Sequence, residues 1–104
     1  MKMTPTLLTL LFFTCGAFAA DVAAGKAIYD KSCKRCHGGD GAANAAIAKM
    51  MKVEMRHLGS KEVQAKTDAA LKKESVEGVG KMKGIAIADA DATNLVAFLR
   101  TLKQ

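Results

Sequence analysis

Apolar residues beyond position 20 recur every three or four residues, which is the spacing of an amphipathic α-helix. Four helices are predicted from this pattern, over residues 21–33, 45–60, 67–78 and 89–104. Asp21 is a good N-cap for the first of them, whereas Gly59 and Gly78 stand where the second and third should end. Because no segment shows convincing alternation of apolar and polar residues, the fold is predicted to be all-α, with about four helices and long loops.

The first and last helices carry apolar faces. Gly25 and Tyr29 lie one turn apart in the first helix. The last helix places four large side chains on one face, namely Leu95, Phe98, Leu99 and Leu102. Two glycine-rich stretches, residues 37–44 and 78–84, are predicted to be loops.

The beginning of the chain has a pattern of its own. Lys2 is followed by an apolar run over residues 7–13, and an A-x-A sequence over residues 17–19 closes the segment. This pattern is typical of a cleavable secretory signal peptide, and the run is too short to span a bilayer comfortably. We therefore predict a signal peptide over residues 1–19, and one domain over residues 20–104 that keeps no permanent membrane anchor.

Export changes how the composition is interpreted. The whole chain has 16 basic and 10 acidic residues, and loss of Lys2 leaves 15 basic residues and a formal net charge of +5. That balance favours acidic partners or an anionic ligand, whereas nucleic-acid binding is not expected of an exported chain with scattered basic residues. Tyr29 and Phe98 are the only aromatic residues after residue 20, so an apolar cofactor would supply missing core material. Lipoprotein processing at Cys15 is an alternative, although bulky residues before it fit that signal poorly.

The sequence CKRCH at residues 33–37 is the chain's strongest chemical signal. A zinc site needs about four ligands, and His57 is the only histidine outside this motif. A thioredoxin-like redox pair would follow a strand, and a disulfide would close only a very small loop. C-x-x-C-H is also the attachment signature of c-type haem. In that interpretation, Cys33 and Cys36 form thioether bonds to the haem vinyl groups and His37 binds the iron, so all three residues are used.

At this point the mature chain resembles a known family, the small class I cytochromes c of bacterial periplasms and mitochondria. The resemblance rests on Gly25 and Tyr29 before the motif, and on Leu95 and Phe98 in the last helix. It implies the cytochrome c fold, in which the N- and C-terminal helices cross and long loops surround one covalently attached haem c. Gly25 would let the two helices approach closely, and the early position of the motif argues against the four-helix-bundle cytochromes.

A methionine or a second histidine commonly binds the other face of such an iron. The chain offers five candidates, namely Met50, Met51, Met55, Met82 and His57. Methionines on a helical stripe are usually core residues, whereas Met82 lies between glycines in a predicted loop. The resemblance places the axial methionine in a loop before the last helix, where Met82 lies, although Lys83 stands where a proline is usual. His57 and an open iron site are the alternatives.

Two further departures from the family pattern concern the surroundings of the haem. The family often has a proline whose carbonyl accepts a hydrogen bond from the second nitrogen of the axial histidine, and this chain has none there. A backbone carbonyl between about Asp40 and Ile47 is therefore predicted to accept this hydrogen bond from His37 instead of the proline carbonyl. Glu74 and Ser75 stand in the third helix where an apolar pair is expected.

The resemblance implies a soluble periplasmic one-electron carrier that is a monomer and not an enzyme. It would shuttle electrons between respiratory or photosynthetic redox proteins with acidic docking surfaces. The lysines at positions 34, 81 and 83 are candidates to surround the exposed haem edge. Two alternatives stay open: a five-coordinate or bis-His haem protein that senses a ligand, and an electron-donor subunit bound to one periplasmic dehydrogenase.

Overall fold

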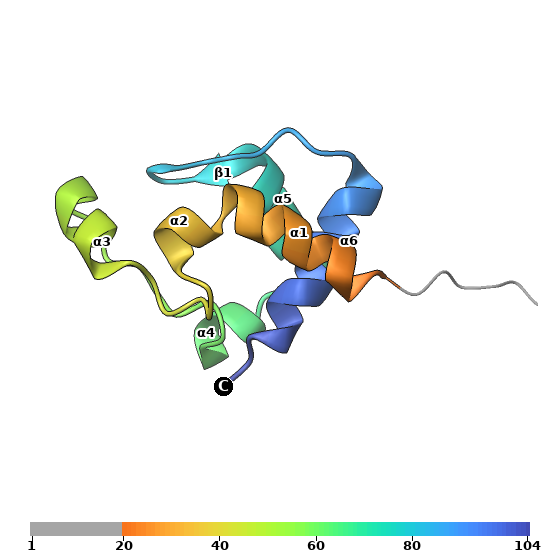
Figure 1. Ribbon diagram of the computed structural model, residues 1–104, viewed down its shortest axis with the longest axis horizontal. Helices are drawn as coiled ribbons and strands as arrows, with labels where there is room; N and C mark the ends of the chain where they lie inside the picture. Colours follow the sequence, from red (N-terminus) through yellow and green to blue (C-terminus); the bar gives the residue numbers. More distant parts are fainter. Residues whose placement is uncertain (1–19) are drawn as a thin grey trace, which may run out of the picture.

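The computed structural model describes residues 20–104, in which six helices and one short hairpin follow one another (Figure 1). The helices are α1 (Val22–Ser32), α2 (Lys34–His37), α3 (Ala45–Met51), α4 (Lys61–Gln64), α5 (Asp68–Glu77) and α6 (Asp89–Thr101). The strands β1 (Gly78–Val79) and β2 (Met82–Lys83) pair antiparallel between α5 and α6. The prediction of an all-α fold is confirmed, because this hairpin is the only sheet in the described part. The predicted signal peptide lies outside that part.

The crossing of α1 and α6 is the centre of the fold (Figure 1). A Cβ atom at Gly25 would lie 1.9 Å from the carbonyl oxygen of Asn94, so the two backbones meet where only glycine fits. Tyr29 and Leu95 are fully buried beside this contact, and the rings of Tyr29 and Phe98 lie 4.9 Å apart between centroids. The predicted crossing of the N- and C-terminal helices is therefore confirmed.

Local capping explains where the predicted helices begin and end. The Asp21 side chain accepts a hydrogen bond from the Ala24 amide at 3.0 Å, and the Asp21 amide donates to the Asn94 side chain at 2.9 Å. Thr67 caps α5 by accepting from the Ala70 amide. Gly78 ends α5 as predicted, with a φ of 82° that favours glycine.

The predicted helix over residues 45–60 is wrong in its second half, because α3 ends at Met51. Lys52 adopts a left-handed conformation with a φ of 55°, which ends the helix. The chain then returns to the loop that follows the motif, where the Leu58 amide donates to the Gly41 carbonyl at 2.9 Å. Gly59 also packs directly on the Leu102 carbonyl, so tertiary contacts override the helical spacing of the apolar residues after Met51.

Arg100 connects α6 to the segment between α4 and α5. Its guanidinium donates to the Asp68 carboxylate at 2.7 Å, and to the carbonyls of Gln64 and Lys66 at 2.8 and 2.7 Å. A small second core lies nearby, formed by Val63, Leu71 and Val96. Since Asp68 is in the first turn of α5, this network fixes the start of the helix that leads to the hairpin.

The close contact at Gly25 gives a stability prediction. In Gly25→Ala, the added Cβ atom overlaps the Asn94 carbonyl, and we expect the free energy of unfolding to fall by at least about 2 kcal/mol. Helix propensity alone would favour alanine by about 1 kcal/mol, so a net loss isolates the overlap. Urea unfolding followed by circular dichroism measures this difference.

Gly80→Ala is the matched control, because a Cβ atom there meets nothing within 4 Å. Its positive φ of 56° should cost only about 1 kcal/mol. Equal stability of Gly25→Ala and the wild type would contradict the backbone contact.

Candidate cofactor site at the CKRCH motif

The motif lies where α1 ends and α2 begins. Cys33 is both the C-cap of α1 and the N-cap of α2, and its amide donates to the Tyr29 carbonyl at 2.8 Å. The His37 amide donates to the Cys33 carbonyl at 3.0 Å, so the motif forms one helical turn. Cys33 and Cys36 are both half-buried free thiols, and their separation of three residues places them on one side of this turn. The geometry suits attachment of one group through both sulfurs.

Burial shifts the pKa of two residues of the motif, Cys33 and His37. It raises the pKa of the Cys33 thiol to about 11, with a smaller contribution from neighbouring Cys36. It also lowers the pKa of His37, so the imidazole is neutral near pH 7 and can bind a metal. A reactive redox thiol needs a lowered pKa, so the thiol–disulfide interpretation is not supported.

One nitrogen of the His37 imidazole has no hydrogen-bond partner among residues 20–104. Its Nδ1 atom is buried and makes no hydrogen bond within the described part of the chain. Within the predicted window of acceptors, the Gly41 carbonyl bonds the Leu58 amide and the Asn44 carbonyl bonds the Ala48 amide. A buried polar atom without a partner is costly, which marks this histidine as unusual among the side chains of the fold.

The loop after His37 is tied to the helix crossing by Tyr29. The hydroxyl of this fully buried residue donates to the carbonyl of Gly38, the residue next to His37. Burial and the nearby Cys33 raise the pKa of Tyr29 to about 12, so the hydroxyl keeps its proton. The sequence predicted only an aromatic packing role for Tyr29. Its hydroxyl group is the sequence feature that could have indicated the hydrogen bond to the loop after His37.

The five candidates for a second ligand lie in different surroundings. Met82 is in β2 and 36% exposed, whereas Met50 is 70% exposed on α3 and therefore is not a core residue. Met51 and Met55 are half-buried. The Nδ1 atom of His57 accepts a hydrogen bond from the Gly59 amide at 2.8 Å.

Glu74 and Ser75, which stand in α5 where an apolar pair was expected, both have polar partners. Glu74 forms an ion pair with Lys66, with both carboxylate oxygens within 3.0 Å of the ammonium. The Ser75 hydroxyl donates to the Leu71 carbonyl at 2.8 Å, and the Ser75 carbonyl accepts from the Ile85 amide. Helix α5 thus accommodates both residues without an unpaired polar group.

The segments on the motif side of the fold bury none of their own side chains. Helices α2 and α3 contain no buried residue, and the hairpin residues are half-buried or exposed. Large apolar side chains are exposed there, including Val79, Met50 and Met82. Two free thiols, a half-buried imidazole whose buried Nδ1 atom has no partner among the described residues, and uncovered apolar side chains fit a large apolar group that binds a metal through His37.

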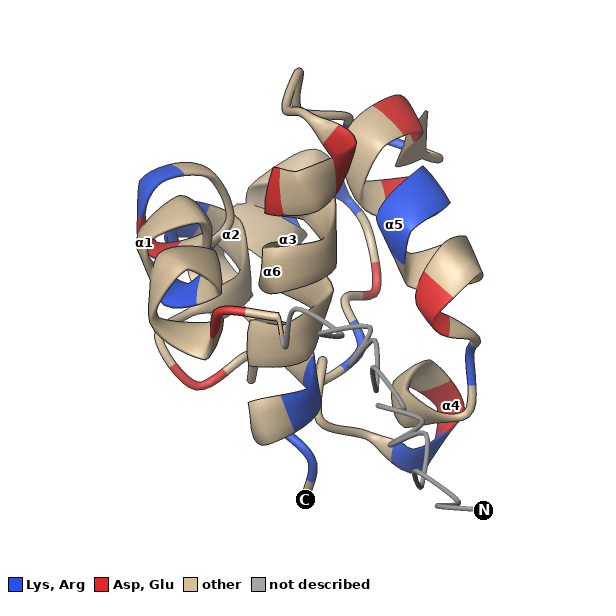
Figure 2. Cartoon of the chain, turned by 90° about the vertical axis from the view of Figure 1, so that its right-hand side faces the viewer, with Lys and Arg blue, Asp and Glu red and all other residues tan. Residues whose placement is uncertain are grey.

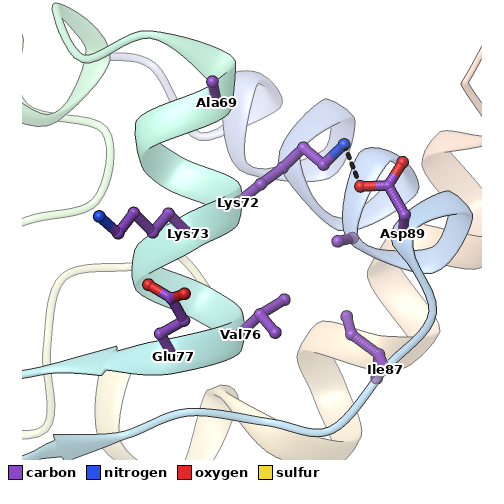
Figure 3. Close-up of a pocket in the computed structure, with 8 residues that line it drawn as sticks. Ala69, Lys72, Lys73, Val76, Glu77, Ile87 and Asp89 are labelled. Atoms are coloured by element: carbon purple, nitrogen blue, oxygen red, sulfur yellow. Dashed lines mark ion pairs between the residues drawn. The ribbon is translucent and has the colours of Figure 1, made fainter.

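A groove of about 440 Å³ lies elsewhere, between α5 and the chain leading into α6 (Figure 3). The ammonium of Lys72 and the carboxylate of Asp89 meet across it at 2.6 Å, and Val76 and Ile87 line it. None of the predicted site residues contributes to this groove. Within residues 20–104, no three acidic, histidine or cysteine side chains are grouped to hold a metal, and no helix is long and apolar enough to cross a membrane.

Comparison with known proteins gives a consistent result. The family model for cytochrome c matches residues 22–103. Cytochrome c-554(547) of Halothiobacillus neapolitanus is 32% identical over 91 residues, which cover 82% of this chain and 100% of that protein. The solved structure of the KustC0563 c-type cytochrome matches with a TM-score of 0.65 at 25% identity, covering 77% of this chain and 98% of that one. The chain therefore belongs to the cytochrome c family, and it is a small electron-transfer protein with the cytochrome c fold and a covalently bound haem c.

Proposed function

We propose that the protein is a soluble periplasmic one-electron carrier, in which His37 and Met82 bind the two faces of the haem iron. The observation that carries the proposal is the half-buried, neutral imidazole of His37 beside two free thiols, with a buried Nδ1 atom that has no partner in the described part of the chain. The predicted leader over residues 1–19 supports export, and the family supports electron transfer.

Each residue has a distinct task in this proposal. Cys33 and Cys36 hold the haem through thioether bonds, and His37 supplies a nitrogen ligand from the same helical turn. The haem supplies the one-electron chemistry of its iron when bound. The thioether of Met82 is a soft ligand that favours Fe(II) and raises the reduction potential relative to two histidines. With both axial positions filled, no open site is left for a substrate.

The distribution of charge supports docking to acidic redox partners. Residues 31–58 and 78–88, which hold the motif and the hairpin, contain eight basic and two acidic residues. The rest of the domain contains seven basic and eight acidic residues, and residues of both signs occur together on α4 and α5 (Figure 2). All four ion pairs found among the described residues join partners in this balanced remainder. The positive charge on the motif side is thus uncompensated and can steer an acidic partner.

The methionine ligand is tested by Met82→Ala. Loss of the thioether should abolish the weak far-red sulfur-to-iron absorption band, lower the reduction potential and let the reduced protein bind carbon monoxide. Absorption spectra and redox titration of the haem-loaded protein measure these changes. Met50→Ala and His57→Ala are the controls, and both should keep the wild-type spectrum.

A wild-type protein that itself binds carbon monoxide readily would contradict His/Met ligation and favour the ligand-sensing alternative. If the absorption spectrum of the wild type changed in His57→Ala but not in Met82→Ala, the two axial ligands would instead be His37 and His57.

The charge distribution gives a second prediction for this function. Reduction of the haem-loaded protein by a negatively charged flavodoxin should slow roughly tenfold or more when salt is raised from low to high concentration. Lys34→Glu should slow this reaction at low salt, because Lys34 lies inside the motif. Lys73→Glu is the matched control, since Lys73 is equally a lysine but lies in the balanced part on α5.

Stopped-flow mixing measures both rates, and reduction by an uncharged hydroquinone checks that the haem itself is unchanged. An equal effect of the two variants would show that only total charge matters, which contradicts a local docking surface.

A further inference from the structure

The hairpin that carries Met82 has few bonds of its own. Its strands are two residues long and pair Gly78 with Lys83 and Val79 with Met82. Gly80 and Lys81 form the turn, and Gly80 has a φ of 56°. An isolated pair of strands is only marginally stable in water, so this segment needs support from elsewhere in the fold.

Helix α3 presents a carbonyl that the helix itself leaves free. Met51 is its last residue, and the amides that follow bond to the carbonyls of Ala48 and Lys49. The ammonium of Lys81 donates to the Met51 carbonyl at 2.8 Å, across 30 residues of chain. The last carbonyls of a helix attract cations, which gives this contact a physical reason. In Figure 1 the hairpin extends from α5 toward the side on which α3 lies.

We infer that Lys81 is a positioning residue, which ties the turn of the hairpin to the end of α3 and so limits opening of the segment that carries Met82. The inference rests on the proposed ligation by Met82. Opening of the hairpin would separate the thioether from the iron and admit an external ligand. The bond from Lys81 opposes that motion directly, because Lys81 precedes Met82 in the chain.

Lys83 offers a matched comparison on the other side of Met82. It is an exposed lysine of β2, and its side chain makes no hydrogen bond or ion pair within residues 20–104. Lys81 and Lys83 therefore carry the same charge next to the same ligand and differ in their contacts. An effect of charge alone on the haem should be similar for both, whereas an effect of the contact should be confined to Lys81.

The experiment uses haem-loaded protein with the variants Lys81→Ala, Lys83→Ala and Lys81→Arg. The first measurement is hydrogen–deuterium exchange of the amides in residues 78–84, which reports how often the hairpin opens. The second is the rate at which imidazole binds the oxidised iron. Loss of one net hydrogen bond should raise both rates roughly two- to tenfold in Lys81→Ala. Lys83→Ala should stay within about twofold of the wild type, and Lys81→Arg should restore slow opening because it keeps a charged donor.

Wild-type exchange in Lys81→Ala would overturn the inference, and so would equal acceleration in Lys83→Ala. Faster hydrogen–deuterium exchange without faster imidazole binding would show that the Lys81 contact stabilises the hairpin but does not limit access to the iron. That result would also overturn the inference. The exchange measurement does not depend on which residue binds the iron. The absorption spectrum of Met82→Ala tests independently whether Met82 binds the iron.

Discussion

The backbone contact between α1 and α6 at Gly25 is the constraint on which the rest of the structure depends. The Cβ-free surface of Gly25 lets the Asn94 carbonyl approach, and Tyr29 and Leu95 are then buried completely next to it. Because α1 leads directly into Cys33, the crossing also fixes where the motif begins. The hydroxyl of Tyr29 extends this control to Gly38, so one buried residue links the helix crossing to the loop beside His37.

The chain builds its own core on only one side of this crossing. Its buried side chains come from α1, α4, α5 and α6, whereas α2, α3 and the hairpin bury none. The covalently bound haem c is therefore expected to have a structural task in this small domain, since it offers an apolar packing partner to segments that bury none of their own side chains among the described residues. Attachment through two thiols makes that partner permanent, which suits a domain with few core residues of its own.

How far the sequence predicts this fold depends on the range of the interactions involved. Helices α1, α5 and α6 were predictable because caps such as Asp21 and Thr67 and apolar faces are local signals. The motif was predictable because covalent attachment demands a fixed spacing. The hairpin and the early end of α3 were not, because two-residue strands show no alternation and the return of the chain depends on the bond from Leu58 to Gly41. The contact of Lys81 with Met51 joins residues 30 positions apart and has no local signal.

The separation of charge follows the same division of the domain. Ion pairs such as Arg100–Asp68 stabilise the part that builds its own core, and their charges cancel within it. The part that holds the motif has a formal net charge of +6, whereas the rest of the domain has −1, so all of the net positive charge lies in the motif part. A carrier must approach its partner quickly and then leave, and unpaired surface lysines meet both needs because their attraction is long-ranged at low salt and weak on contact. In the proposed function, the electrostatic attraction to a partner therefore acts mainly near the haem. Of the two lysines beside Met82, only Lys81 also makes a contact that holds the segment carrying this ligand.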